Sequence, residues 1–110
     1  MPIVEHYEIE TLILSNGKCP FDEWIETLEE SEKVMVDDRL IRVMAGSFGE
    51  KRSLQRGLWE LKFRVGAAIR IYYGHSGQKV VLLLVGGNKR TQRKDIKDAR
   101  KLWDAFKNKE

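Results

Sequence analysis

The residues best suited to chemistry in this chain are cations on two neighbouring predicted strands. Residues 58–65 alternate, so that apolar side chains point one way while charged side chains, Lys62 and Arg64 among them, point the other. The next predicted strand, residues 68–74, places Arg70 on the face opposite its isoleucines. An arginine side chain is planar and charged, and it can bind two oxygens of one phosphate. We therefore expect an exposed basic face that serves as the functional surface.

Three further polar positions lie close to these strands. Tyr73 shares the apolar face of residues 68–74, so we expect its neighbour Tyr72 to be exposed. Lys89 and Arg90 follow the third predicted strand and precede a helix, whose dipole disfavours cations at that end. Since this loop contains no carboxylate to pair with them, we favour phosphate binding over a merely basic loop.

A three-strand antiparallel meander is predicted to hold these residues. It comprises residues 58–65, 68–74 and 80–85, with a tight connection at Gly66 and the small residues that follow it. The last strand is apolar at every position, which is typical of a strand in the centre of a sheet. An earlier strand is predicted over residues 3–14.

Helices are predicted before and after the meander. Pro20 opens the first, and Ser31 is expected to cap a second over residues 32–44. Thr91 is expected to cap a last helix over residues 92–107, whose apolar stripe should dock on the sheet. Short helices segregated to one side of an antiparallel sheet make an α+β domain, which is the predicted fold class.

The length and charge of the chain indicate one domain, 1–110, with a polyanion-binding half. Residues 1–50 contain four basic and twelve acidic residues, a net charge of −8, whereas residues 51–110 contain sixteen and five, a net of +11. Such a split favours nucleic acid as a partner. Residues 45–56 are predicted to be a loop, whose cations lead directly into the meander. The expected nucleic-acid-binding residues are Lys51, Arg52, Arg56, Arg64, Arg90 and Arg93.

Composition argues against several classes of protein. No window of 18 apolar residues could span a membrane, and the acidic, alternating N-terminus is unlike a signal peptide. A single cysteine, Cys19, excludes an internal disulfide and fits a reducing cytosol. The two histidines and the cysteine lack metal-site spacing. We expect a cytoplasmic protein without a metal or cofactor.

Four short motifs occur in order along nearly the whole chain. They are Gly46-x-Phe48-Gly49, Gly57-Leu58-Trp59-Glu60-Leu61, Arg70-x-Tyr72-Tyr73 and Gly86-Gly87-x-Lys89-x-x-Gln92-x-x-Asp95-Ile96. Together they resemble the addiction-module killer proteins of the RelE/ParE toxin superfamily, on the HigB-like branch. The resemblance implies a RelE-like α+β fold: an N-terminal strand, a two-helix hairpin, the meander, and a C-terminal helix packed on the sheet.

The resemblance also implies a toxin that is encoded beside a helix-turn-helix antitoxin, with a heterotetramer as one expected assembly. Many members cut mRNA on the ribosome without a metal: the RNA 2′-hydroxyl attacks the adjacent phosphate. That chemistry needs a base, cations for the developing charge, and an acid for the leaving oxygen. The family's positions correspond here to Lys62, Arg70, and Lys89 or Arg90, with Tyr72 as a substitute base.

The chain departs from the ribonuclease pattern at its C-terminal helix. Ile96 stands about where that branch has a tyrosine, so the acid–base pair is incomplete. Two alternatives therefore stay open. One is a ParE-like inhibitor of DNA gyrase that performs no chemistry, and the other is a plain RNA-binding domain.

Overall fold

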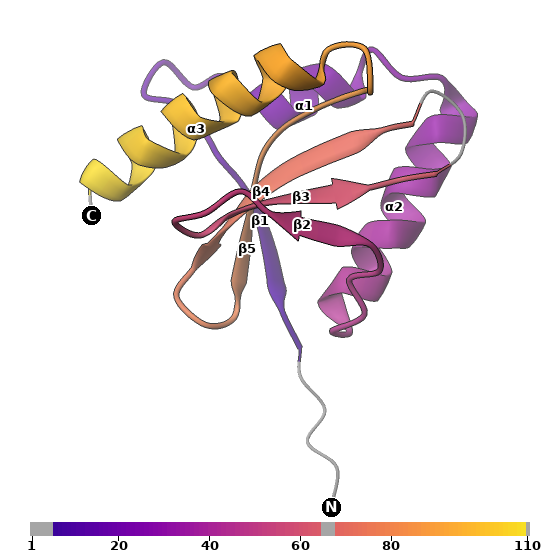
Figure 1. The fold of residues 1–110 in the computed structure, drawn as a ribbon, viewed down its shortest axis with the longest axis horizontal. Coiled ribbons are helices and arrows are strands. Elements are labelled where there is room, and N and C mark those ends of the chain that lie inside the picture. Colours follow the sequence, from indigo (N-terminus) through magenta and orange to yellow (C-terminus); the bar gives the residue numbers. More distant parts are fainter. Residues whose placement is uncertain (1–5, 65–67, 110) are drawn as a thin grey trace, which may run out of the picture.

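Five strands form one mixed sheet in the order β1-β5-β4-β3-β2, which crosses the centre of the molecule (Figure 1). This computed structural model describes residues 6–64 and 68–109. The strands are β1 (Glu8–Thr11), β2 (Lys51–Ser53), β3 (Leu58–Lys62), β4 (Arg70–Ser76) and β5 (Val80–Gly87). β1 runs parallel to β5, and every other neighbouring pair is antiparallel. The predicted meander, the central position of its third strand and the α+β class are confirmed.

The predicted boundaries of several elements differ from the structure. Residues 45–56 are not all loop, because β2 pairs there with β3 along the sheet edge. All three β2 residues are exposed, so the strand has no apolar alternation that would reveal it. The strand predicted over residues 58–65 ends at Lys62. The predicted turn at Gly66 and Ala67, and the start of the strand predicted over residues 3–14, lie outside the described residues.

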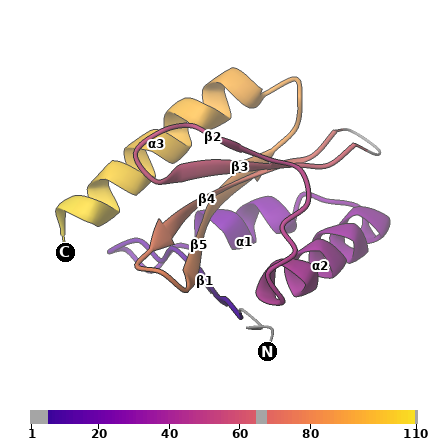
Figure 2. The ribbon, with the colours of Figure 1, turned by 60° about the horizontal axis from the view of Figure 1, so that its bottom comes forward.

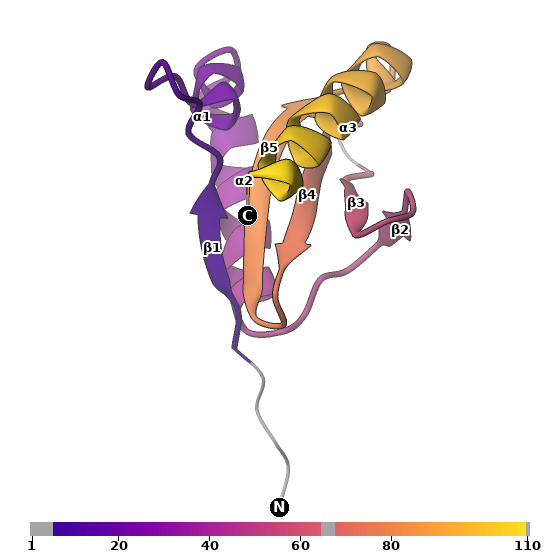
Figure 3. The same cartoon turned by 90° about the vertical axis from the view of Figure 1, so that its left-hand side faces the viewer.

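The helices lie on both faces of the sheet, which corrects the expectation that they share one side. They are α1 (Pro20–Ile25), α2 (Glu30–Met44) and α3 (Gln92–Asn108). Figures 2 and 3 show α3 on one side of the strands and α1 and α2 on the other. The physical reason is that β4 and β5 bury side chains on both faces, so each face needs a helical cover.

Two apolar clusters follow from this layering. The cluster on the α1–α2 side contains Phe21, Val36, Val43, Phe48, Leu61, Phe63, Ile69, Ile71, Tyr73, Val81 and Leu83. The cluster beneath α3 contains Leu12, Leu58, Tyr72, Leu82, Leu84, Ala99 and Trp103, which confirms that α3 docks on the sheet. Gly74 permits close packing here, because a Cβ atom at that position would lie 2.4 Å from the Trp103 ring.

The start of α2 differs from the prediction by two residues. The cap position is Glu29, whose backbone N–H donates to the Glu32 side chain at 3.0 Å, and Ser31 lies inside the helix. Glu29 and Glu32 form a capping box, in which the side chain of each residue accepts from the backbone N–H of the other. This pairing places the start of the helix two residues before the predicted one. Within residues 6–64 and 68–109, no helix has the length and apolar character needed to cross a membrane.

Candidate phosphate-binding site

Strand register brings the principal predicted residues into one row at the end of the sheet. Lys62 pairs with Arg70 across β3 and β4, and Arg70 pairs with Gly87 across β4 and β5. Lys89 follows two residues after Gly87, just before α3 begins. A pocket of about 270 Å³ opens at this point, lined by Lys62, Phe63, Arg64, Ala68, Arg70 and Lys89.

This pocket, hereafter the cation pocket, has four basic side chains and no carboxylate among the described residues that line it. Lys89 is exposed and makes no ion pair with any residue in the described ranges. Such an excess of positive charge in one concave site favours an anionic ligand. The arrangement supports phosphate binding rather than a sheet face that is merely solvated.

Arg70 corrects the expectation of an exposed basic face. Its residue is only 7% exposed, because α3 covers this face of the sheet. Its Nη1 atom donates to the Ala68 carbonyl oxygen at 3.0 Å, and its Nε atom lies 3.8 Å from Glu60 Oε2. These contacts hold the guanidinium in one place, so Arg70 is a preorganised cation at the inner end of the cation pocket.

Tyr72 is also buried, contrary to prediction. It is fully buried beneath α3, and its hydroxyl has no hydrogen-bond partner among the described residues. Burial, and then the charge of Glu60 nearby, raise the pKa of Tyr72 well above its usual value. Burial therefore disfavours the phenolate form, which counts against Tyr72 as the substitute base.

Glu60 is the buried partner that the sequence did not single out. Its side chain is fully buried and accepts from Arg52 Nε at 3.2 Å and from Gln92 Nε2 at 2.9 Å. It therefore joins β2, β3 and the first turn of α3 beside Arg70. Its place within the Gly57–Leu61 motif was the available signal, but alternation alone assigned it to a solvated face.

Arg39 of α2 holds the segment before β2 against the end of β3. Its guanidinium donates to three backbone carbonyls: Phe48 at 2.8 Å, Glu50 at 2.8 Å and Lys62 at 2.9 Å. It also stacks over the Phe63 ring at 4.7 Å. Burial, and then the nearby Arg42, lower the pKa of Arg39. The sequence signal was a cation three residues after Val36, within the buried stripe of the helix.

A second pocket, of about 260 Å³, adjoins the cation pocket and shares two residues with it. Its lining is Arg39, Arg42, Ser47, Gly49, Glu50, Lys62 and Arg64. Glu50 accepts from Arg64 Nε at 2.6 Å and from Arg64 Nη2 at 3.1 Å, and it lies 3.8 Å from Lys62 Nζ. The hydrogen bonds from Arg64 are the main reason why the pKa of Glu50 is lowered.

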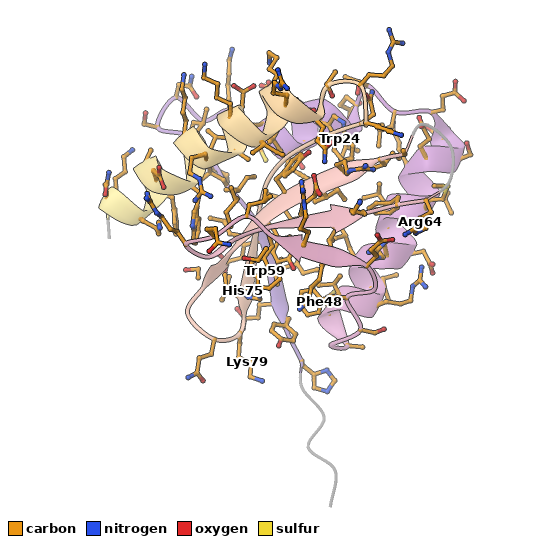
Figure 4. The ribbon with its side chains drawn as sticks, viewed as in Figure 1. Trp24, Phe48, Trp59, Arg64, His75 and Lys79 are labelled. Carbon is orange, nitrogen blue, oxygen red and sulfur yellow. The ribbon has the colours of Figure 1, made fainter. Side chains whose placement is uncertain are left out.

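The remaining predicted nucleic-acid-binding residues do not gather at one site. Lys51 Nζ lies over the rings of Phe48 and Trp59, at 4.4 and 4.8 Å from their centroids. Figure 4 shows Phe48, Trp59 and His75 together, well away from Arg64. Arg52 is engaged by Glu60. The side chains of Arg56, Arg90 and Arg93 are exposed and form no ion pair within the described residues.

Comparison with known proteins gives the chain a family context. Residues 23–105 match the model of a family described as Phage derived protein Gp49-like (DUF891). A Haemophilus influenzae protein, itself named only as uncharacterized, is 37% identical over 83 residues, which cover 74% of this chain and 84% of that protein. The family match includes every described residue that lines the cation pocket. Among the described residues, no group of three or more His, Cys, Asp or Glu side chains could hold a metal ion.

Proposed function

The chain belongs to the Gp49-like family of phage-derived proteins, and we propose that it is the toxin of a toxin–antitoxin module. The family is consistent with such a role, and the ordered motifs that resemble HigB-like members of the RelE/ParE superfamily support it further. The α+β fold agrees with the one that this resemblance implies.

We propose further that the toxin is a ribosome-dependent endoribonuclease that cuts mRNA in the cytoplasm and so inhibits translation. The observation that supports this activity is the cation pocket: Lys62, Arg64, Arg70 and Lys89 converge without a lining carboxylate in the described chain. In RNA cleavage by the 2′-hydroxyl, the attacked phosphate gains negative charge in the transition state. Preorganised cations stabilise that charge more than they stabilise the ground state.

In this proposal three of the pocket cations have separate tasks. Arg70, held by Ala68 and Glu60, binds the scissile phosphate through its guanidinium. Lys62 supplies a second charge from the adjacent strand. Lys89 is the exposed ammonium of the pocket, free of ion pairs with described residues, and it is the proton donor for the leaving 5′-oxygen. As the 2′-oxygen–phosphorus bond forms and the bond from phosphorus to the 5′-oxygen breaks, the proton of the 2′-hydroxyl passes to a solvent water molecule.

A second candidate function is ParE-like inhibition of DNA gyrase by contact alone. The observation that favours it is that Tyr72 is buried and that Ile96 stands about where the ribonuclease branch has a tyrosine. In that case the cation pocket would bind an acidic surface rather than a reacting phosphate.

The proposed partner in the cell is an antitoxin encoded by the neighbouring gene. The net charge of +11 over residues 51–110 should attract an acidic segment of that protein, because charge complementarity steers association. The two proteins should co-elute at low salt in a complex such as a heterotetramer.

The proposal is tested by induced expression in a bacterial host. We expect growth arrest that is relieved when the neighbouring gene is co-expressed, together with the loss of full-length mRNA. Supercoiling by purified gyrase in the presence of the protein separates the two candidates. Unchanged supercoiling supports the ribonuclease, whereas blocked supercoiling with intact mRNA supports the gyrase inhibitor. Normal growth with abundant folded protein would contradict both.

A further inference from the structure

In the pocket that adjoins the cation pocket, the carboxylate of Glu50 pairs with the two basic side chains that have no other partner there among the described residues. Of its four basic residues, Arg39 is committed to backbone carbonyls, and Arg42 is paired with Asp38 at 2.9 Å. Lys62 and Arg64 remain, and both contact the Glu50 carboxylate. Arg64 holds the two Glu50 oxygens with two different nitrogens, which is the fork geometry by which arginine also binds a phosphate.

We infer that Lys62 and Arg64 form a second phosphate subsite, for a backbone phosphate next to the scissile one, and that the Glu50 carboxylate occupies this subsite in the free protein. The inference rests on the proposed function, because the ligand is the same RNA strand. Lys62 and Arg64 line both pockets, so a strand bound in the cation pocket continues into the adjoining one.

The Glu50 side chain can leave while its backbone stays in place. The Glu50 carbonyl oxygen accepts from Arg39 Nη2 at 2.8 Å and from the Lys62 backbone N–H at 3.0 Å, so the main chain is held on two sides. Among the described residues, the carboxylate contacts only Arg64, whose side chain is 83% exposed, and Lys62 at a longer distance. Exposed ion pairs are weak, so a phosphate can displace this one.

The consequence is a local competition rather than a change of fold. While Glu50 is bound, it neutralises Arg64 and the subsite attracts polyanions weakly. When RNA enters, Arg64 exchanges the carboxylate for a phosphate oxygen pair, and Glu50 turns toward solvent. Removal of the Glu50 charge should therefore strengthen RNA binding. Removal of a residue that itself contacts the RNA would instead weaken binding.

The test measures the affinity of a short single-stranded RNA with 2′-O-methyl groups, which cannot be cleaved. Glu50→Gln is expected to bind about 2- to 5-fold more tightly than the wild type at 0.1 M salt. Its plot of log affinity against log salt should have about the same slope as that of the wild type, because both proteins make the same phosphate contacts once Glu50 has been displaced. Glu8→Gln, an exposed change of equal charge on β1, is the matched control and should leave both quantities unchanged.

Arg64→Gln tests whether the effect runs through the proposed contact. In the Arg64→Gln background, Glu50→Gln should give no further gain, because the competed cation is absent. Carboxyl NMR gives a readout in the unaltered chain: the lowered pKa of Glu50 should rise when the RNA binds. A wild type that binds RNA while Glu50→Gln binds equally or less tightly would overturn the inference alone. A wild type that binds no RNA would overturn the proposed function with it.

Discussion

At the scale of single residues, we expect the buried pair of Arg70 and Glu60 to contribute both to the stability of the fold and to the proposed activity. Arg70→Ala would leave the fully buried Glu60 carboxylate with one cation fewer, although Arg52 and Gln92 still contact it. We expect a loss of about 1–3 kcal/mol in the free energy of unfolding, measured by urea titration. Arg93→Ala, an exposed change without ion pairs in the described chain, should stay within about 0.5 kcal/mol.

A second substitution tests whether the lost stability comes from the unpaired charge of Glu60 or from the lost side-chain volume of Arg70. Glu60→Gln in the Arg70→Ala background removes the stranded charge but keeps the side-chain volume, so part of the lost stability should return. If Arg70→Ala unfolds at the same urea concentration as the wild type, the buried ion pair does not stabilise the fold, and the positioning of Arg70 by Glu60 loses its support.

His75 makes the fold sensitive to pH near neutrality. It is surrounded by the rings of Tyr7, Phe48, Trp59 and Tyr73, and burial, followed by the charge of Lys51, lowers its pKa. The unfolded chain therefore binds a proton at a higher pH than the folded one, so stability is full above the unfolded pKa and falls as the pH decreases through about 6.5.

The corresponding prediction compares the wild type with His75→Phe, which keeps an aromatic ring but does not titrate. The melting temperature of the wild type should fall between about pH 7 and pH 5 by more than that of His75→Phe. His6→Gln, at an exposed position, is the control and should follow the wild type. Parallel curves for the wild type and His75→Phe would show that His75 does not contribute to the pH dependence.

At the scale of secondary-structure elements, α3 depends on its close approach to β4. A Cβ atom on residue 74 would lie 2.4 Å from the Trp103 ring, so Gly74→Ala should push α3 away from the sheet and cost about 1–3 kcal/mol in unfolding free energy. Trp103→Leu should relieve part of this clash, giving a double variant that is more stable than the sum of the single effects predicts. Strictly additive losses in chemical denaturation would contradict direct contact as the cause.

The sequence predicted the elements better than it predicted their faces. Apolar alternation identified β3 and β4, and an unbroken apolar run identified β5 as central. The same alternation could not tell which polar residues would be covered, because Arg70 and Tyr72 have polar groups at the ends of long apolar side chains. Only the docking of α3, an interaction between distant segments, decides that both are buried.

The cation pocket was predictable because its main residues come from segments that are neighbours in the sequence. Lys62, Arg70 and Lys89 belong to consecutive strands or their ends, so local pairing is enough to bring them together. Arg39 and Glu50 were not predictable as site residues, because their contacts depend on how α2 and the segment after it fold over the end of β3. The basic residues outside the meander were assigned by charge alone, and Lys51 and Arg56 lie elsewhere.

At the scale of the whole molecule, the proposed reaction site lies in the basic half of the chain, residues 51–110. The central claim is that the cation pocket cleaves mRNA, and Lys89 is the residue that tests it with least effect on folding, since it is exposed and makes no ion pair with described residues. Lys97→Gln is its matched control, an exposed lysine on α3 that does not line the cation pocket.

The most direct measurement is primer-extension mapping of an mRNA after purified protein is added to translating ribosomes. The wild type and Lys97→Gln should produce the same new mRNA ends, while Lys89→Gln should cut about 100-fold more slowly, with an unchanged melting temperature, because the proton donor for the leaving 5′-oxygen is lost. Cleavage by Lys89→Gln at the wild-type rate, or intact mRNA with every variant, would contradict the claim.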